Sequence, residues 1–457
     1  MKIWISFILL FSFSVLAETS NYYVERRSYG TLRDTEPPRY VKPLKSWLDL
    51  GLDYRLRYEH RDNDFRRARQ VTDNPLLHRT RIYLGIKDFL GPLRLGLELS
   101  DARRSHSVFP KDNRDVNELE PLQAFGELYF QNLLGEDRPA SLKVGRLAFE
   151  YLDRRLIARN EWRNTTNTFE GARLKLGQEK NDWQLDVLAL RPLIRIQEKI
   201  DPVDQAQKFY GAIGDIRRWS KVVTLQPYYL ALEQDGEKVL YNQSGNRVTS
   251  NGIDRLIHTT GLRAYGIVGN SHFDYDGNYA IQKGNNGNQQ QDAKSYIAEL
   301  GYSPQYNWKP RLSLNHGFAS GDKKIGDRRQ QRFERLFGFS RPWSNNDYIQ
   351  MENIKALKLR GEVEPFQNWR LDAGWNWYWL DSAKDLWSSA NLQDSNGKSG
   401  KDIGQEFDVR SRFQHTKLIS TQIGYAYFMG GRFTKKTSPD RESNSHFFYY
   451  EMTLTAF

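Results

Sequence analysis

The feature that most constrains this chain is a strict alternation of apolar and polar residues, seen most clearly in residues 47–60, WLDLGLDYRLRYEH. Every second residue from Leu48 to Tyr58 is apolar, and those between are charged residues or glycine. Successive side chains of a β-strand point to opposite faces, so the pattern predicts a strand with one apolar and one charged face. Such a strand fits a soluble sheet, and it also fits a membrane barrel whose apolar face meets lipid.

The alternation recurs and predicts about 18 strands, a count within the range of outer-membrane barrels. Residues 79–87 and 93–100 both alternate and flank a turn at Gly91 and Pro92, which predicts a hairpin. The strands are expected to begin near residues 48, 78, 92, 122, 141, 168, 182, 207, 221, 256, 272, 293, 310, 353, 368, 404, 418 and 446.

Composition favours the membrane setting. Only 39% of the residues are hydrophobic and the mean hydropathy is -0.74, yet aromatic residues reach 13%. A barrel with a polar lumen and aromatic girdles has this composition, whereas a large soluble sandwich needs a more apolar average. A propeller would repeat every 40–50 residues or so, and no such repeat is present. The prediction is an all-β fold, a transmembrane antiparallel β-barrel of about 18 strands.

The N-terminus reads as a secretory signal. Lys2 precedes an apolar run from Ile3 to Leu16, which is too short to span a bilayer, and cleavage is expected after Ala17. An uncleaved apolar anchor is the alternative. Beyond Ala17 no stretch has the character of a membrane-spanning helix, so any spanning must be done by strands. The expected organisation is a signal peptide at 1–17, a periplasmic segment at 18–44 and a barrel at 45–457. Long polar stretches at 101–121, 233–252, 320–350 and 381–403 are expected to be extracellular loops.

Residues 143–175, KVGRLAFEYLDRRLIARNEWRNTTNTFEGARLK, carry the most specific pattern. It resembles the signature of the alginate export family of outer-membrane porins, which here falls on Gly145, Arg146, Tyr151, Asp153, Arg155, Leu156, Trp162, Asn164, Phe169, Gly171 and Arg173. Further matches lie at 318–324 with 332–339, and at 403–410 with 424–433. One departure is Asn167, which stands where a basic residue is expected.

The resemblance implies a monomeric 18-stranded barrel in the bacterial outer membrane, with a narrow, arginine-rich lumen that passes an anionic polyuronate. Its partners would be membrane lipid and lipopolysaccharide, the anionic polysaccharide or a small anionic substrate, and periplasmic export proteins. The positive charge is spread along alternating strands rather than clustered, which argues against nucleic acid as a partner.

Arginines on the charged phase of the strands or within the signature are candidates for the pore constriction, because guanidinium groups pair with carboxylates and rings of them select anions. Nearby carboxylates would hold them in place. The expected constriction residues are Arg55, Arg57, Arg79, Arg81, Arg146, Asp153, Arg155, Glu170, Arg173, Arg360, Glu406, Asp408, Arg410 and Arg412. Each could instead be a wall-lining salt bridge. The stripe Trp375, Trp377 and Trp379 is expected to face lipid.

No residue pattern indicates catalysis, a cofactor or a metal. The chain has no cysteine, and none of its eight histidines has the spacing of a metal site. Ser313 and His316 have no hydrolase motif around them. The chain is therefore predicted not to be an enzyme. The leading hypothesis is a channel for an anionic polysaccharide or oligouronate, and the alternatives are an uptake porin for small anionic nutrients, such as sugar acids or aromatic acids, and a barrel-anchored adhesin or hydrolase.

Overall fold

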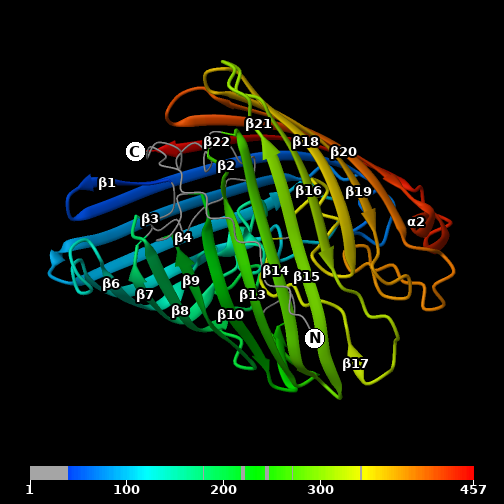
Figure 1. Ribbon diagram of the computed structural model, residues 1–457, viewed down its shortest axis with the longest axis horizontal. Helices are drawn as coiled ribbons and strands as arrows, with labels where there is room; N and C mark the ends of the chain where they lie inside the picture. The colour runs from blue at the N-terminus through cyan, green and yellow to red at the C-terminus, as the bar shows by residue number, and fades with distance from the viewer. Residues whose placement is uncertain are drawn as a thin grey trace, which may run out of the picture.

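The wall of the protein is a closed antiparallel β-barrel (Figure 1). The computed structural model describes residues 40–456 apart from 179, 218–221, 242–245, 270 and 340–341. Eighteen described strands form the wall: β2 (Leu48–Asp62), β3 (Leu76–Leu90), β4 (Leu93–Ser105), β5 (Asn117–Phe130), β6 (Ala140–Leu147), β7 (Phe169–Gly177), β8 (Trp183–Pro192), β9 (Gln207–Ile216), β10 (Thr224–Gln234), β13 (Arg255–Ile267), β14 (Phe273–Asn286), β15 (Gln289–Tyr302), β16 (Arg311–Ala319), β18 (Ile354–Phe366), β19 (Trp369–Trp379), β20 (Asp402–Gln414), β21 (Ile419–Gly430) and β22 (Asn444–Ala456).

Each wall strand pairs with its sequence neighbours, and the barrel closes where the first wall strand meets the last. The register of β2 against β22 runs without interruption from Leu52 opposite Ala456 to Asp62 opposite His446. The predicted fold class and strand number are therefore confirmed, and each predicted strand start lies within five residues of an observed one. The turn at Gly91 and Pro92 joins β3 to β4 as predicted.

Shorter elements decorate the wall. Strand β1 (Val41–Lys45) pairs with the first residues of β2, and β17 (Arg329–Gln330) pairs with β15. A separate hairpin is formed by β11 (Glu237–Tyr241) and β12 (Arg247–Asn251). The described helices are the one-turn η1 (Leu152–Arg154) and α2 (Arg432–Thr437). No described helix has the length and apolar character needed to traverse a bilayer.

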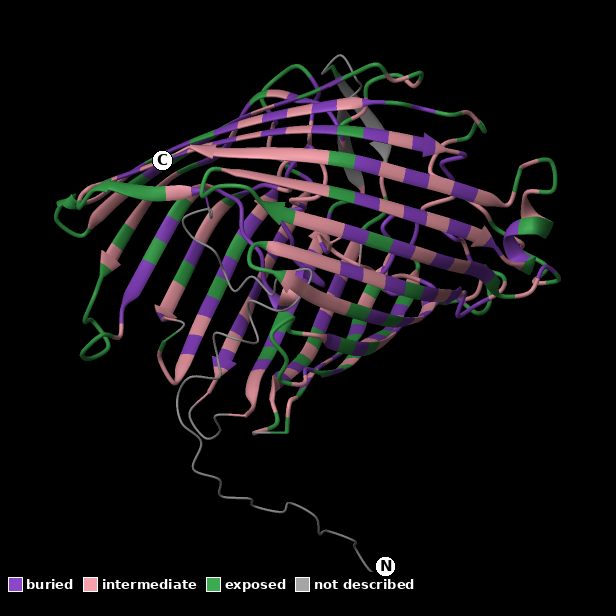
Figure 2. Cartoon of the chain, turned by 90° about the horizontal axis from the view of Figure 1, so that it is seen from above, coloured by how far each residue is buried: buried purple, intermediate pink, exposed green. Residues whose placement is uncertain are grey.

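The burial pattern is inside out relative to a soluble sheet. Along β4, the apolar Leu95, Leu97 and Leu99 are about 40% exposed, whereas Glu98 between them is fully buried. Figure 2 shows the alternating bands of buried and exposed residues along the strands. This is the arrangement of a barrel with a lipid-facing exterior and a polar interior. The predicted outward stripe is present, since Trp375 is exposed and Asn376 beside it is buried.

The two ends of the barrel differ in the length of their connections. One end has short turns, such as 367–368 and 415–418, and the other carries the long segments 63–75, 106–116, 148–168, 193–206, 320–353 and 380–401. In outer-membrane barrels short turns face the periplasm and long loops face the exterior. All four segments expected as long loops belong to the second end, although strands β4 and β5 extend into the stretch expected at 101–121.

Candidate functional site

Two long segments fold back from the exterior end into the lumen and meet there. The first is residues 148–168, between β6 and β7, and the second is residues 332–353, before β18. The amide of Ala158 donates to the carbonyl oxygen of Phe337 at 3.0 Å, and Ile157 and Phe337 form a parallel bridge. Asn167 donates to the carbonyls of Ala158 (2.9 Å) and Phe337 (3.3 Å). The residue that departs from the family signature thus joins the two inward segments.

Apolar side chains seal part of the space behind these segments. Phe149 stacks on Phe169 at 5.3 Å between ring centroids, and Phe337 packs edge-on against Phe169 and Phe209. Phe169 and Phe209 are fully buried. The exterior half of the lumen is therefore partly filled by packed apolar side chains, in addition to the polar groups that the composition predicts.

Four of the expected constriction arginines hold the first inward segment in place. Arg55 donates to the carbonyl oxygens of Glu161 (2.7 Å) and Arg163 (2.9 Å). Arg57 donates to the carbonyl of Trp162 at 2.6 Å, and its guanidinium lies 4.1 Å from the centroid of that indole ring. Hydrogen bonds to backbone carbonyls fix a segment whichever side chains it carries, so these arginines act as anchors of residues 161–163.

The two arginines of β3 bind the side chains of the same stretch, and Arg79 also donates to the carbonyl oxygens of Glu161 (3.2 Å) and Arg163 (3.3 Å). Arg81 donates to the Glu161 carboxylate and to the Thr166 hydroxyl, both at 2.6 Å. Arg79 lies 3.5 Å from the carboxylates of Asp53 and Glu161. Arg79 and Arg81 are buried, so breaking one of these pairs would leave an uncompensated charge out of water.

Tyr40, at the start of the described chain, lies inside the barrel and joins this network. Its hydroxyl donates to Glu98 at 2.6 Å, and Arg159 of the inward segment donates to the same carboxylate oxygen at 2.7 Å. The Tyr40 ring lies over Gly51, where a Cβ would be 2.8 Å from it. Tyr40, directly before β1, therefore contacts the wall from the lumenal side.

Acidic residues of β20 hold the second inward segment. Glu406 accepts hydrogen bonds from the Ser344 hydroxyl (2.6 Å), the Asn345 amide (2.7 Å) and the Asn346 side chain (2.9 Å). Asp408 accepts from the side chain of Asn345 at 2.8 Å. Glu406 and Asp408 were expected at the constriction, and they lie on the lumenal phase of β20 with their carboxylates engaged by residues 344–346.

The same segment packs directly on the wall at Gly317 of β16. The Trp343 ring covers this glycine so closely that any Cβ there would overlap it, and the Trp343 indole donates to Asn315 at 2.8 Å. We expect Gly317→Ala to displace Trp343 and to lower the free energy of unfolding by about 1–3 kcal/mol, the usual cost of overpacking. Urea titration of the purified barrel measures this. Gly361→Ala is the matched control because no atom lies within 4 Å of a Cβ there, and equal losses in both variants would contradict the prediction.

Between the inward segments and strands β15, β16 and β18 of the wall lies a small cavity. It measures about 80 Å³, against about 410 and 470 Å³ for two cavities nearer the short-turn end. Five cations and three carboxylates line it: Arg154, Arg155, Arg311, Lys358, Arg360, Asp153, Glu299 and Glu362. Ile297, Phe339, Trp343 and Met351 add an apolar side. We call this the constriction cavity.

Carboxylates of the wall fix the orientation of the cations there. Arg155 lies 3.0 Å from Asp276, and Arg311 binds Asp274 at 2.6 Å as well as Glu299 and Glu362. Arg360 binds Asp372, to which Arg410 (3.1 Å) and Arg412 (3.0 Å) also donate. Asp276 and Asp372 do not line the cavity, so its immediate lining carries an excess of two positive charges.

Two predicted residues lie nearer the short-turn end. Arg173 lines the cavity of about 410 Å³ together with Lys143 and Lys175. Arg412 lines the cavity of about 470 Å³ with Arg370 and Lys309. Both cavities are therefore basic on part of their surface, and they are separate from the constriction cavity.

The expectation that Arg146 and Glu170 line the constriction is wrong. These residues are opposite each other in the β6–β7 register and share the outward phase with Leu142 and Leu174. Glu170 is exposed, and Arg146 pairs with Glu120 at 2.5 Å. The lumenal phase of these strands belongs instead to residues such as Lys143 and Arg173, and the signature motif alone does not reveal that phase.

Sequence reasoning missed several constriction residues. Arg311, Lys358 and Glu299 lie on the lumenal phase of β16, β18 and β15, so a complete reading of the alternation could have found them. Arg154 and Phe339 lie on the inward segments, where no strand periodicity exists to place them. Among the residues that the structure describes, no group of His, Asp and Glu side chains could hold a metal ion.

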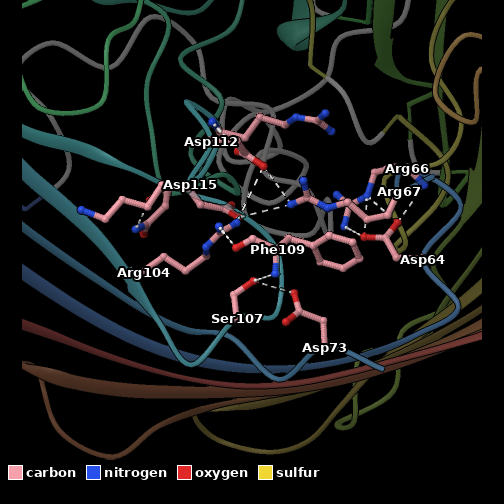
Figure 3. A network of polar contacts seen from close by, with 12 residues as sticks. Asp64, Arg66, Arg67, Asp73, Arg104, Ser107, Phe109, Asp112 and Asp115 are labelled. Atoms are coloured by element: carbon pink, nitrogen blue, oxygen red, sulfur yellow. Dashed lines mark hydrogen bonds and ion pairs between the residues drawn. The ribbon is translucent and has the colours of Figure 1, made fainter. Parts of the chain in front are cut away.

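A network of ion pairs stabilises the exterior loops around residues 63–75 and 106–116 (Figure 3). Arg66 binds Asp64 at 2.8 Å, Arg67 binds Asp112 at 2.8 Å, and Arg104 binds Asp115 at 3.0 Å. Ser107 donates to Asp73 at 3.0 Å. These contacts tie the two loops to each other.

The Asp115 carboxyl carries the pH dependence of this network. Burial raises its pKa, but Arg61 and Arg104 outweigh burial and lower the pKa to about 2. An aspartate in an unfolded chain has a pKa of about 3.9, so the stabilisation is complete above that pH and is lost as the pH falls through about 2.

We therefore expect pepsin to cleave the loop at Phe109 slowly at pH 4 and faster as the pH falls towards 2, after correction for the pH dependence of pepsin itself. Mass spectrometry of the fragments measures the rate. Asp115→Asn, which lacks the charge at every pH, should be cleaved rapidly already at pH 4. Equal rates in the two proteins would contradict the assignment.

Comparison with known proteins identifies the relatives of this barrel. A family model described as alginate export matches residues 46–448. Among solved structures, the fold is similar to three barrels from Pseudomonas aeruginosa. They are OccK11 (OpdR; 16% identity, TM-score 0.57, 90% of this chain and 96% of that chain), OpdQ (13%, 0.58, 90% and 97%) and the outer membrane protein opdK (10%, 0.59, 90% and 98%). No curated protein sequence matches the chain at a significant level.

Proposed function

This chain belongs to the alginate export family, and from that premise we propose that it is an outer-membrane channel that passes an anionic polysaccharide or oligouronate, alginate-like in its chemistry. The observation that carries the proposal is the lining of the constriction cavity, where five cations face three carboxylates. Guanidinium groups bind carboxylates in pairs, and a cationic constriction of low dielectric favours anions over cations.

Asp153, Arg155 and Arg360 are the predicted constriction residues that line this cavity. We propose Arg155 and Arg360, with Arg154, Arg311 and Lys358, as the groups that contact the passing carboxylates, and Asp153 as a partner that positions Arg155 at 3.5 Å. Their wall partners would keep each cation in place while the polymer moves. The role proposed for Arg55, Arg57, Arg79 and Arg81 is indirect, because these side chains are engaged by residues 161–166.

One observation favours the second candidate, an uptake porin for small anions. The constriction cavity measures only about 80 Å³, and the two inward segments meet within the lumen. A small carboxylate would pass such a constriction without movement of the segments, whereas a polymer would require more room.

The test is the reversal potential of the purified barrel in a planar bilayer under a KCl gradient, with and without uronate oligomers. Anion selectivity together with block by oligomers supports the polyuronate channel. Anion selectivity with block by monomeric sugar acids but not by oligomers supports the small-anion porin. Cation selectivity would contradict both, since the constriction cations would then be neutralised by their wall partners.

A further inference from the structure

Three arginines on separate exterior loops have no carboxylate partner. They are Arg114 from residues 106–116, Arg195 from residues 193–206 and Arg335 from residues 320–353, and we call them the vestibule arginines. Within the described part of the chain, none of them forms an ion pair, although most arginines of this barrel do. All three are half-buried, so their charge is only partly hydrated.

The first inward segment, residues 148–168, connects two of these loops through Thr165. Arg195 donates to the hydroxyl of Thr165 at 2.9 Å, and that hydroxyl donates in turn to the carbonyls of Asn113 (2.8 Å) and Arg114 (3.1 Å). The side chain of Asn113 also reaches the carbonyl of Arg195 at 3.5 Å. Thr165 is therefore the point where the loops of Arg114 and Arg195 meet.

Asp347, whose charge also acts on Arg114, is shared by two other cations. It binds Arg163 and Arg66, each at 3.1 Å through the same carboxylate oxygen. Its charge is therefore divided among several guanidinium groups.

The electrostatics are consistent with an uncompensated positive cluster. Burial and the nearby charge of Arg163 lower the pKa of Arg195 to about 10, with smaller contributions from Arg114 and Arg335, although Asp201 opposes them. Burial, Arg66 and Arg163 likewise lower the pKa of Arg114, and Asp112 and Asp347 oppose them. Like charges that depress one another mark a place where a bound anion would be stabilised.

We propose that Arg114, Arg195 and Arg335 form an anion-binding site at the exterior approach to the constriction, which takes the carboxylates of an oligouronate. The inference rests on the proposed function and adds a second binding position to it. Arg163 and Thr165 belong to the segment whose residues 153–155 line the constriction cavity. An oligomer held at the vestibule arginines is thus adjacent to the narrow path.

Calorimetric titration of the full-length barrel in detergent tests the site, with trigalacturonate as the probe. We expect Arg114→Gln/Arg195→Gln to weaken binding by about tenfold or more, since two charge-assisted contacts are lost. Arg195→Lys, which keeps the charge, should retain most of the affinity. Arg328→Gln is the matched control, because Arg328 is an exposed arginine on one of the same loops and lies outside the cluster. Folding of each variant is checked by its heat-modifiable gel mobility.

Unchanged affinity in the double variant, or an equal loss in Arg328→Gln, would overturn the proposal. If the double variant does not fold, Arg335→Gln replaces it. Undiminished binding of trigalacturonate by that variant would likewise overturn the proposal. Inorganic phosphate serves as a second probe, and binding of phosphate without binding of trigalacturonate would overturn the assignment to uronates. The wild-type reversal potential distinguishes failure of this site from failure of the proposed function. Anion selectivity without probe binding contradicts this site alone. Cation selectivity contradicts the proposed function.

Discussion

A channel in which Arg55 and Arg57 are both replaced by alanine is expected to carry severalfold more current than the wild-type channel. These side chains hold the carbonyls of residues 161–163 against β2, and no apolar contact of alanine replaces those hydrogen bonds. Without them, Arg79 and Arg81 remain as the wall arginines that hold this stretch, and we expect it to leave the lumen more often and so to widen the path. The measurement is single-channel conductance in a planar bilayer.

Two controls separate release of the segment from loss of charge. The Arg55→Lys/Arg57→Lys variant keeps both charges near Glu451 but loses the planar fork that reaches two acceptors at once, so an intermediate conductance with frequent fluctuations is expected. Arg94→Ala removes an arginine that lines the short-turn cavity and does not touch the inward segment. If the double alanine variant conducts like wild type, residues 148–168 do not limit the current.

Replacement of Arg311 by glutamine is expected to weaken anion preference and to destabilise the barrel by about 3–5 kcal/mol, the cost of breaking a buried ion pair. Arg311 is the common partner of Asp274, Glu299 and Glu362. Once it is removed, Asp274 and Glu299 lose this arginine, whereas Glu362 keeps a longer pair with Arg360 at 3.8 Å. The excess of positive charge in the cavity lining falls from two to one. Reversal potential and urea titration report the two effects.

Arg360→Gln is the matched comparison on the neighbouring strand. Its partner Asp372 keeps Arg410 and Arg412, so a small loss of stability and a partial loss of anion preference are expected. The prediction is that Arg311→Gln lowers the free energy of unfolding more than Arg360→Gln does. Equal losses would contradict it, because the number of carboxylates that lose their arginine would then not determine the loss of stability.

Much of the wall was predictable because its information is local. The alternation Leu48, Leu50, Leu52 against Asp49, Gly51 and Asp53 sets the two faces of β2 from neighbouring residues alone, and the same rule gives every other wall strand. In a membrane barrel the apolar face of each strand meets lipid and the polar face meets the lumen. The strand number, the turn at Gly91 and the outward tryptophan stripe follow from it.

The site was less predictable because long-range contacts decide it. Arg55 meets Glu161 106 residues later in the chain, and Asn345 meets Glu406 across 61 residues. Strand periodicity places Arg55 on the lumenal face. It does not indicate that a loop will fold back into the lumen and accept the hydrogen bonds of that side chain. Arg146 shows the opposite error, since a family motif identified it and the strand phase directs it outward.

The barrel can close only when its first and last wall strands, β2 and β22, pair with each other. Strand β2 is bonded on one side to β3, the next strand in sequence, and on the other to β22, which is separated from it by nearly the whole chain. Loss of the last strand would expose two long unpaired edges, the kind of surface that aggregates. The pairing of β2 with β22 therefore forms only after synthesis of β22, and until then both strands have an edge that is open to pairing with other chains.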